Sequence, residues 1–270
     1  SSITSFTIPE SVTSIGDNCF ENNKKLTTVT IGSGCKTLPA SAFAGCSLLS
    51  NVTLPDGLTT ISNKAFANCV SLTSISIPGT VTSVGTATSS LEYLPFYGCT
   101  ALKSVRFEDG ASLIYLGARY NNSSTGSGLF YSCPLEEVYI GRNIKYEDYN
   151  SSYRFASYPE YYGYSAFYNK SKLAKVTIGE NVSIIQQYAF YKCSALTTVT
   201  FGNSLTEIPQ YAFYGCKLTA VTLPNTVTRI REYAFYENSA LASADLGDAV
   251  TQIAEYAFNG CSVLDGISLP

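Results

Sequence analysis

The chain has 270 residues, of which 14% are charged and 45% are hydrophobic, and its formal net charge at pH 7 is −3. This low charge and the absence of long basic runs argue against a nucleic-acid groove. No stretch approaches the roughly 18 consecutive apolar residues of a membrane-spanning helix. The chain starts at Ser1 with neither Met nor a secretion signal, and we interpret it as a mature or trimmed fragment.

A short phrase built on Ala-Phe recurs from one end of the chain to the other, for example "SAFAGC" from Ser41 and "YAFYKC" from Tyr188. The repeat phenylalanines are Phe20, Phe43, Phe66, Phe96, Phe130, Phe167, Phe190, Phe213, Phe235 and Phe258. Successive members are 23, 23, 30, 34, 37, 23, 23, 22 and 23 residues apart. A period in the twenties predicts a solenoid, so we expect residues 1–270 to form a single array of about ten coils.

Each coil also carries an apolar frame of the form L-x-x-V-x-F, as in Leu196, Val199 and Phe201. The frame alternates apolar and polar residues, which predicts a short strand with one buried face. Because every repeat runs in the same direction, these strands must be parallel. The stretch around the repeat phenylalanine closes the coil as a short turn or at most a helical turn. Leu264 and Ile267 begin an eleventh strand.

The cysteines follow the same period, because seven of the nine lie three residues after a repeat phenylalanine. A catalytic thiol is needed once, whereas free Cys is often buried and packs as a small hydrophobe. Cys19 and Cys35 also occupy frame positions, and we predict that they are core residues. The seven residues of this structural ladder are Cys46, Cys69, Cys99, Cys133, Cys193, Cys216 and Cys261.

Covalent and metal-bound states of these thiols are not expected. Cysteines stacked on neighbouring coils would lie about 4.8 Å apart with parallel Cβ vectors, which leaves the Cβ atoms too far apart for a disulfide. The chain contains no His, and it has no close pair of cysteines, so we predict neither a zinc site nor any other metal or cofactor.

Catalysis has little support in the sequence. Without His, the usual triads and dyads lack their base. Glu147, Asp148 and Glu160 lie in one irregular segment and would serve a glycosidase only if two carboxylates faced each other across a cleft. We interpret them as residues that keep an exposed loop soluble, and we expect no enzyme.

Three consecutive coils carry insertions, near residues 85–94, 117–128 and 146–165. All three enter between the last apolar frame residue and the repeat phenylalanine, so they project from one side, as binding loops of repeat proteins do. The third mixes Tyr with Ser, Asn and Gly, as antibody paratopes do. Loops that only pack on the coil beneath are the alternative. The tyrosines of this insertion are Tyr146, Tyr149, Tyr153, Tyr158, Tyr161, Tyr162 and Tyr164.

The outward positions of the strands are mostly Thr, Ser or Asn, which is typical of an exposed strand face. The middle coils differ, since they place Arg106, Glu137, Tyr139 and Lys175 there. We therefore add Arg106, Glu137 and Tyr139 to the candidate binding residues. Tyrosines also recur directly after the repeat phenylalanine and two residues before it, and their simplest explanation is stacking along the array.

The L-x-x-V-x-I frame resembles that of leucine-rich repeats, and the added "aF-x-x-C-x-x-L" element at a 23-residue step resembles the BspA-like family in particular. The resemblance covers nearly the whole chain. It implies a leucine-rich-repeat solenoid with one parallel β-strand per repeat and short turns on the other side. It also implies a secreted or cell-surface protein, bacterial in most members, that adheres to an extracellular host or bacterial protein.

We therefore predict a non-enzymatic recognition module that binds a protein partner through a face formed by its tyrosine-rich insertions. A glycan-binding module is one alternative, because tyrosine rings and carboxylates suit sugar faces. A structural stalk segment of a larger surface protein is another, although a stalk needs regular coils and three adjacent coils are irregular.

Overall fold

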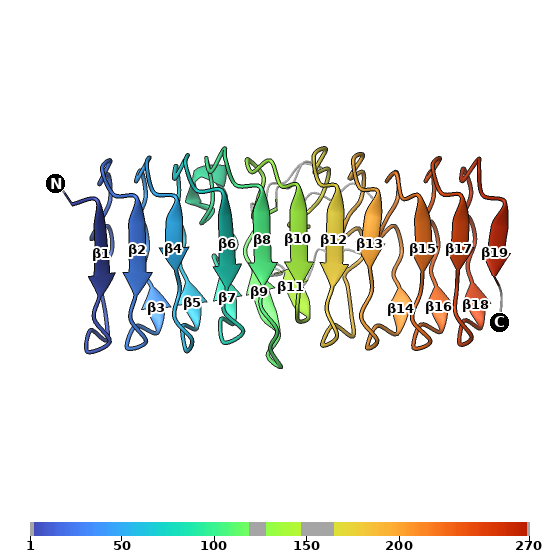
Figure 1. Cartoon of the computed structure of the whole chain (residues 1–270), viewed down its shortest axis with the longest axis horizontal. Helices are drawn as coiled ribbons and strands as arrows, with labels where there is room; N and C mark the ends of the chain where they lie inside the picture. Colours follow the sequence, from blue (N-terminus) through green and yellow to red (C-terminus); the bar gives the residue numbers. More distant parts are fainter. Residues whose placement is uncertain (1–2, 119–127, 147–164, 269–270) are drawn as a thin grey trace.

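The computed structural model describes residues 3–118, 128–146 and 165–268, and in it successive coils place their strands in one long parallel row (Figure 1). The row consists of three hydrogen-bonded groups, β1-β2-β4, β6-β8-β10-β12-β13 and β15-β17-β19. The strands are β1 (Ser5–Ile8), β2 (Thr28–Ile31), β4 (Asn51–Thr53), β6 (Ser74–Ile77), β8 (Ser104–Phe107), β10 (Glu137–Ile140), β12 (Lys175–Ile178), β13 (Thr198–Thr200), β15 (Ala220–Thr222), β17 (Ser243–Asp245) and β19 (Gly266–Ser268). The predicted leucine-rich-repeat solenoid with parallel strands is confirmed.

A second row of short parallel strands follows the first, one turn later in the coil (Figure 1). The repeat pattern does not predict this row, because strands of two or three residues leave no clear alternation. Its strands are β3 (Thr37–Leu38), β5 (Thr60–Ile61), β7 (Ser83–Val84), β9 (Ile114–Leu116), β11 (Ile144–Tyr146), β14 (Glu207–Ile208), β16 (Arg229–Ile230) and β18 (Gln252–Ile253). The described part of the first insertion adds a single 3₁₀ turn, η1 (Leu91–Tyr93).

The side-chain alternation sets the two faces of the main row. In β10, Val138 and Ile140 are buried, whereas Glu137 and Tyr139 point outward. The register aligns Val138 with Val105 of β8 and with Val176 of β12. Apolar side chains of neighbouring coils therefore stack on one another, and the outward side chains form continuous rows on the exposed face.

The core is a stack of the repeat phenylalanines. Neighbouring rings are nearly parallel, with centroids 5.2 to 6.0 Å apart from Phe20 to Phe258. The stack continues through the irregular coils, with 5.3 Å between Phe96 and Phe130 and 6.0 Å between Phe130 and Phe167. Because the ring spacing hardly changes there, the insertions leave the core intact.

The cysteine ladder lies beside this stack, and each thiol donates a hydrogen bond to the carbonyl of the repeat phenylalanine one coil earlier. The Cys69 thiol lies 3.2 Å from the Phe43 carbonyl, and the Cys193 thiol lies 3.0 Å from that of Phe167. In one coil Asn238 replaces the cysteine, and its amide donates to the Phe213 carbonyl at 2.8 Å. The ladder position therefore requires a hydrogen-bond donor rather than sulfur chemistry.

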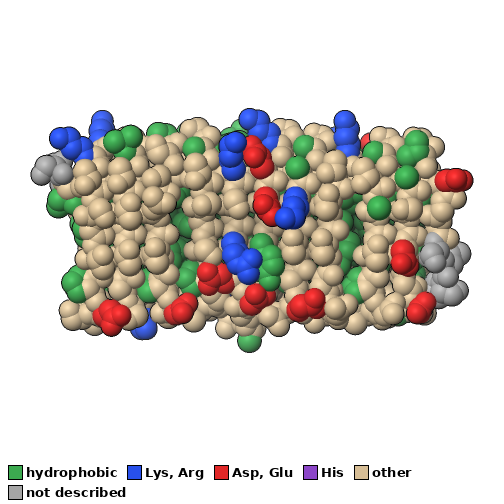
Figure 2. Space-filling model, in the orientation of Figure 1, with side chains coloured by type: hydrophobic (Ala, Val, Ile, Leu, Met, Phe, Trp, Pro, Cys, Tyr) green, Lys and Arg blue, Asp and Glu red, His purple; other side chains and the backbone are tan. Residues whose placement is uncertain are grey.

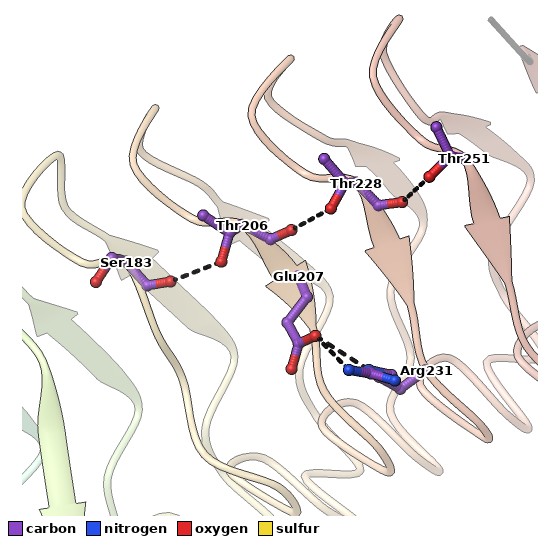
Figure 3. A network of polar contacts seen from close by, with 6 residues as sticks. All are labelled: Ser183, Thr206, Glu207, Thr228, Arg231 and Thr251. Carbon is purple, nitrogen blue, oxygen red and sulfur yellow. Dashed lines mark hydrogen bonds and ion pairs between the residues drawn. The ribbon is translucent and has the colours of Figure 1, made fainter.

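Hydroxyl groups provide a second set of contacts between coils (Figure 3). Thr206, Thr228 and Thr251 each donate to a backbone carbonyl of the preceding coil, at 3.5, 3.3 and 3.2 Å respectively. The first of these acceptors is the carbonyl of Ser183. Coil-to-coil hydrogen bonds of this kind recur because a threonine occupies the same position in several coils.

One feature differs from the sequence expectation. Cys19 is exposed, so the prediction that it is a core residue was wrong. It lies in the first coil that the structure describes, where a second neighbouring coil does not cover it. In addition, the turn from Phe107 to Ile114 spans seven positions, whereas the equivalent turn from Ile140 to Ile144 spans four. This turn follows β8 and reaches beyond its neighbours at the lower edge of the molecule (Figure 1).

Candidate functional site

Charged side chains gather in the middle of the main sheet face, over β8 to β12, while the strands on either side present mostly small polar groups (Figure 2). The middle strands hold three of the predicted candidates together on this surface. We call these three candidates and the charged residues that contact them or extend along the same strands the central patch. Its residues are Lys103, Arg106, Asp109, Glu136, Glu137, Tyr139 and Lys175.

Arg106 and Tyr139 form the aromatic centre of the central patch. They are direct partners in the register of β8 and β10, and the guanidinium carbon lies 3.7 Å from the ring centroid, a cation–π contact. The Tyr139 hydroxyl donates to Asp109 at 2.8 Å, and the Arg106 guanidinium lies 3.7 Å from the second oxygen of the same carboxylate. Asp109 therefore orients both side chains.

Burial, followed by the neighbouring Asp109 carboxylate, raises the pKa of Tyr139 above its ordinary value, and the Arg106 charge opposes this only in part. The phenol is consequently protonated at neutral pH and acts as a donor. Arg106 keeps about half of its side-chain surface exposed, at 47%. A partner can therefore reach part of the guanidinium.

Two further ion pairs extend the patch along β10. Glu137 lies opposite Lys175 of β12, with 2.7 Å between the carboxylate oxygen and the ammonium nitrogen. Lys103 and Glu136 pair at 3.0 Å just before their strands begin. These pairs are about half exposed, so each contributes at most about 1 kcal/mol to stability. They hold the long side chains in place without greatly stabilising the fold.

Tyr146 lies apart from the central patch, in β11 of the second row. Its hydroxyl is 3.1 Å from the hydroxyl of Ser165, which in turn donates to the Ala189 carbonyl at 2.8 Å. The hydroxyl is enclosed even though part of the ring is accessible, and burial raises the pKa of Tyr146 to about 12. Tyr146 and Ser165 bracket the third insertion, so this hydrogen bond closes the base of the loop.

The remaining tyrosines of that insertion lie outside the described residues, and their role stays a prediction. They are Tyr149, Tyr153, Tyr158, Tyr161, Tyr162 and Tyr164. Beside the base of the loop is a cavity of about 10 Å³ lined by Ile140, Ile144, Tyr146 and Phe167 among others. A space of this size holds about one water molecule and is too small for a ligand.

The sequence did not predict that two cations of the central coils are buried and have a structural role. The Arg142 guanidinium donates to the carbonyls of Pro78, Gly79 and Val81 at 2.8, 2.6 and 2.6 Å, two coils away. Burial lowers its pKa to about 10. It lies next to the lengthened turn after β8, and a fully buried arginine there has no sequence signal beyond a charged residue at a turn position.

Lys170 is the second buried cation, and it occupies a cysteine position of the ladder. Its ammonium donates to the carbonyls of Phe130 and Tyr131, the latter at 2.9 Å. Burial lowers the pKa of Lys170 to about 8, and the neighbouring thiols Cys133 and Cys193 oppose this shift. The substitution of Lys for Cys was visible in the sequence, but its hydrogen bonds were not.

The chemistry of the described residues favours structure over catalysis. Burial raises the pKa of the Cys46 thiol to about 11 and those of Cys133 and Cys193 to about 12, so these thiols are protonated and poor nucleophiles. All nine cysteines are free. Within residues 3–118, 128–146 and 165–268 there is no group of three side chains that could hold a metal ion, and no helix long and apolar enough to cross a bilayer.

Comparison with known families gives a direct result. The model of the BspA type leucine rich repeat region matches the chain in six copies, over residues 1–91, 86–157 and 160–270. The chain belongs to the BspA-type leucine-rich repeat family. Family membership confirms the resemblance seen in the repeat phrase, and it favours a protein-binding or adhesion role over catalysis. No curated protein sequence matches the chain significantly.

Several solved structures resemble this BspA-type array. A leucine-rich repeat protein from Bacteroides ovatus is 30% identical, with 98% of this chain and 78% of that chain covered and a TM-score of 0.45. A leucine rich cell surface protein from Faecalibacterium prausnitzii is 26% identical, with 99% and 79% covered and a TM-score of 0.40. The pneumococcal vaccine antigen PcpA is 20% identical, with 98% and 68% covered and a TM-score of 0.40.

Proposed function

We propose that this BspA-type array is a non-enzymatic recognition module of a bacterial cell surface that binds a protein partner through its irregular central coils. The observation that carries the proposal is the interruption of a plain Thr/Ser strand face by the stacked Arg106–Tyr139 pair. Arg and Tyr are the residue types most enriched among the side chains that dominate binding energy at protein interfaces.

The organisation of the central patch supports this role. Asp109 already holds Tyr139 and Arg106 in one arrangement, so little side-chain freedom is lost when a partner binds. Charges of both signs alternate across the patch in the Glu137–Lys175 and Lys103–Glu136 pairs. Such a pattern selects a partner by charge complementarity and register rather than by overall attraction.

The third insertion supplies a second candidate surface. Its base is closed by the Tyr146–Ser165 hydrogen bond, and its composition of Tyr, Ser, Asn and Gly suits recognition. The base lies in the second row of strands, whereas the central patch lies on the main row. We propose that the loop tyrosines form the main protein-binding face and that the central patch contributes from the main row of the same coils.

The test uses two variants on arrays of extracellular proteins and glycans. In one, Arg106→Ser and Tyr139→Thr give the central patch the residue types of the flanking strands. In the other, a short Gly-Ser linker replaces residues 147–164 and joins Tyr146 to Ser165. A flanking variant, Thr30→Ser with Thr200→Ser, is the matched control, and thermal melting checks folding.

The outcomes distinguish the loop face from the central patch. Binding of a protein that is lost in the linker variant, while its melting is unchanged, supports the loop face, and loss in the Arg106/Tyr139 variant supports the central patch. If the parent bound only glycans, the proposed partner would be a sugar rather than a protein. If the parent bound nothing on either array, the recognition proposal would be abandoned in favour of a spacer segment.

A further inference from the structure

Two columns of stacked tyrosines, none of which belongs to the central patch, run along the turns of the C-terminal coils. Tyr211, Tyr233 and Tyr256 belong to the first column, in which neighbouring ring centroids are 4.8 and 5.0 Å apart. Tyr214 and Tyr236 belong to the second, with centroids 4.8 Å apart and ring planes within 13°. The two columns touch through tilted ring contacts at 5.8 and 5.4 Å.

The backbone of these turns does not require tyrosine. The residues two positions before the repeat phenylalanine have positive φ in both halves of the array, for example 54° at Ser41 and 58° at Tyr233. A bulky side chain is unfavourable in this left-handed region. In the N-terminal coils, smaller or flexible residues occupy this position. The tyrosines found there in four C-terminal coils are therefore explained by the stacking of their rings.

We propose that these columns are a site of oxidative crosslinking, in which Tyr214 and Tyr236 of neighbouring coils are joined as dityrosine. A peroxidase with hydrogen peroxide is the oxidant. Each phenol loses one electron and one proton, and the two tyrosyl radicals couple through the ring carbons beside the hydroxyls. The two ring protons then move to the oxygens, so two tyrosines and one hydrogen peroxide give one dityrosine and two waters.

The geometry favours coupling between stacked neighbours of a column over random oxidation. In a biaryl product the ring centres lie only slightly closer than the 4.8 Å already separating Tyr214 and Tyr236. Rotation about Cβ–Cγ, which is a soft torsion, can turn the stacked rings edge to edge. Both rings are half-buried rather than enclosed, so an oxidant and solvent can reach their edges.

Acceptors for the released protons lie nearby. Burial, followed by the nearby carboxylate of Glu237, raises the pKa of Tyr214, so the phenol is protonated before oxidation and a carboxylate is close when the proton leaves. In the other column, burial, followed by Tyr256 and then by Glu255, raises the pKa of Tyr233.

The crosslink can be located by peptide mapping. Trypsin cleaves after Lys192, Lys217 and Arg231, which places Tyr214 in peptide 193–217 and Tyr236 in peptide 232–270. After treatment of the full chain with peroxidase and hydrogen peroxide, we expect dityrosine fluorescence and a joined pair of these peptides lighter by two hydrogens. The crosslinked protein should melt at a higher temperature, because the two coils can no longer separate.

Matched variants decide the assignment. Tyr214→Phe with Tyr236→Phe keeps the stack but removes the phenols, and it should lose most of the joined peptide, whereas the control Tyr115→Phe should retain it. A mixture of unlabelled and ¹⁵N-labelled protein tests that the bond forms within one chain. Absence of the joined peptide, its persistence in the double variant, or mixed-label products alone would each overturn the proposal.

Discussion

The flanking coils and the central coils hold neighbouring turns together with different side chains. In the flanking coils, short donors such as Cys216 and Thr228 each reach one carbonyl on the adjacent coil. In the central coils, where the chain carries extra residues, Arg142 reaches carbonyls two coils away and Lys170 reaches two successive carbonyls. The central coils also contain ladder thiols such as Cys99 and Cys133, and they differ in having long cationic side chains that each reach several carbonyls at once.

The largest effect is expected from Arg142→Met, which leaves the carbonyls of Pro78, Gly79 and Val81 without these donors. A buried carbonyl left without its donor costs about 1–3 kcal/mol of unfolding free energy, and three carbonyls lose a donor here. Urea denaturation measures this, with Arg229→Met on the exposed side of β16 as the control. A loss below about 1 kcal/mol would mean that the lengthened turn does not depend on Arg142.

The second prediction concerns Lys170, whose folded pKa of about 8 is below its unfolded value of 10.5. The unfolded chain binds more protons between these values, so the free energy of unfolding rises with pH from about 8 to 10.5. The shift corresponds to a total of about 3 kcal/mol. Below pH 8 the penalty for burying the charge is fully present.

This prediction is measured as the difference between the parent and Lys170→Met from pH 7 to 10, which cancels the titration of other groups. We expect the parent to gain stability relative to the variant across this range. Parallel pH profiles for the two proteins would contradict a depressed lysine pKa.

A smaller effect is expected for a ladder residue of a flanking coil. Cys216→Ala removes the thiol that donates to the Phe190 carbonyl at 3.2 Å and leaves a small void. We expect a loss of about 1–2 kcal/mol, since a buried carbonyl then lacks this partner. Cys216→Asn, which copies the natural replacement at Asn238, should recover part of that loss in the same denaturation experiment. An Asn variant less stable than the Ala variant would show that side-chain volume, not donation, determines the residue at this position.

The smallest effect is expected at the surface pair Glu207–Arg231 (Figure 3), whose side chains keep 37% and 36% of their surface exposed. Glu207→Gln removes the ion pair but keeps the shape. The unfolding free energy should fall by no more than about 1 kcal/mol and should fall less in high salt. A larger, salt-independent loss would indicate that this contact is part of the core of its coil.

The repeat pattern was sufficient to predict most of the fold. The spacing of Phe190, Phe213 and Phe235 predicted the coils, and the alternation around Val199 predicted the parallel strands. The short second row was missed because two residues such as Glu207 and Ile208 carry no periodic signal. Exposure of Cys19 was missed because a pattern repeated in every coil does not reveal which coils are covered on both sides.

The candidate site was predicted less completely. Arg106, Glu137 and Tyr139 were identified by their departure from the Thr/Ser face, and they do lie together on that face. Asp109, which orients two of them, was not identified, because it lies just beyond the strand, in a turn whose length differs from coil to coil. Tyr146 was assigned to the loop face, but its hydroxyl is enclosed at the base of the insertion.

The sequence by itself determined the family, the repeat, the direction of the strands and the residues that form the core. All of these follow from one motif that recurs about ten times in the same register. Only the tertiary structure decided which unrepeated side chains meet. Arg142 finds acceptors 61 to 64 residues away, and Lys170 finds acceptors 39 and 40 residues away. These distances along the chain depend on the length of each coil, so a contact across irregular coils cannot be obtained from the period alone.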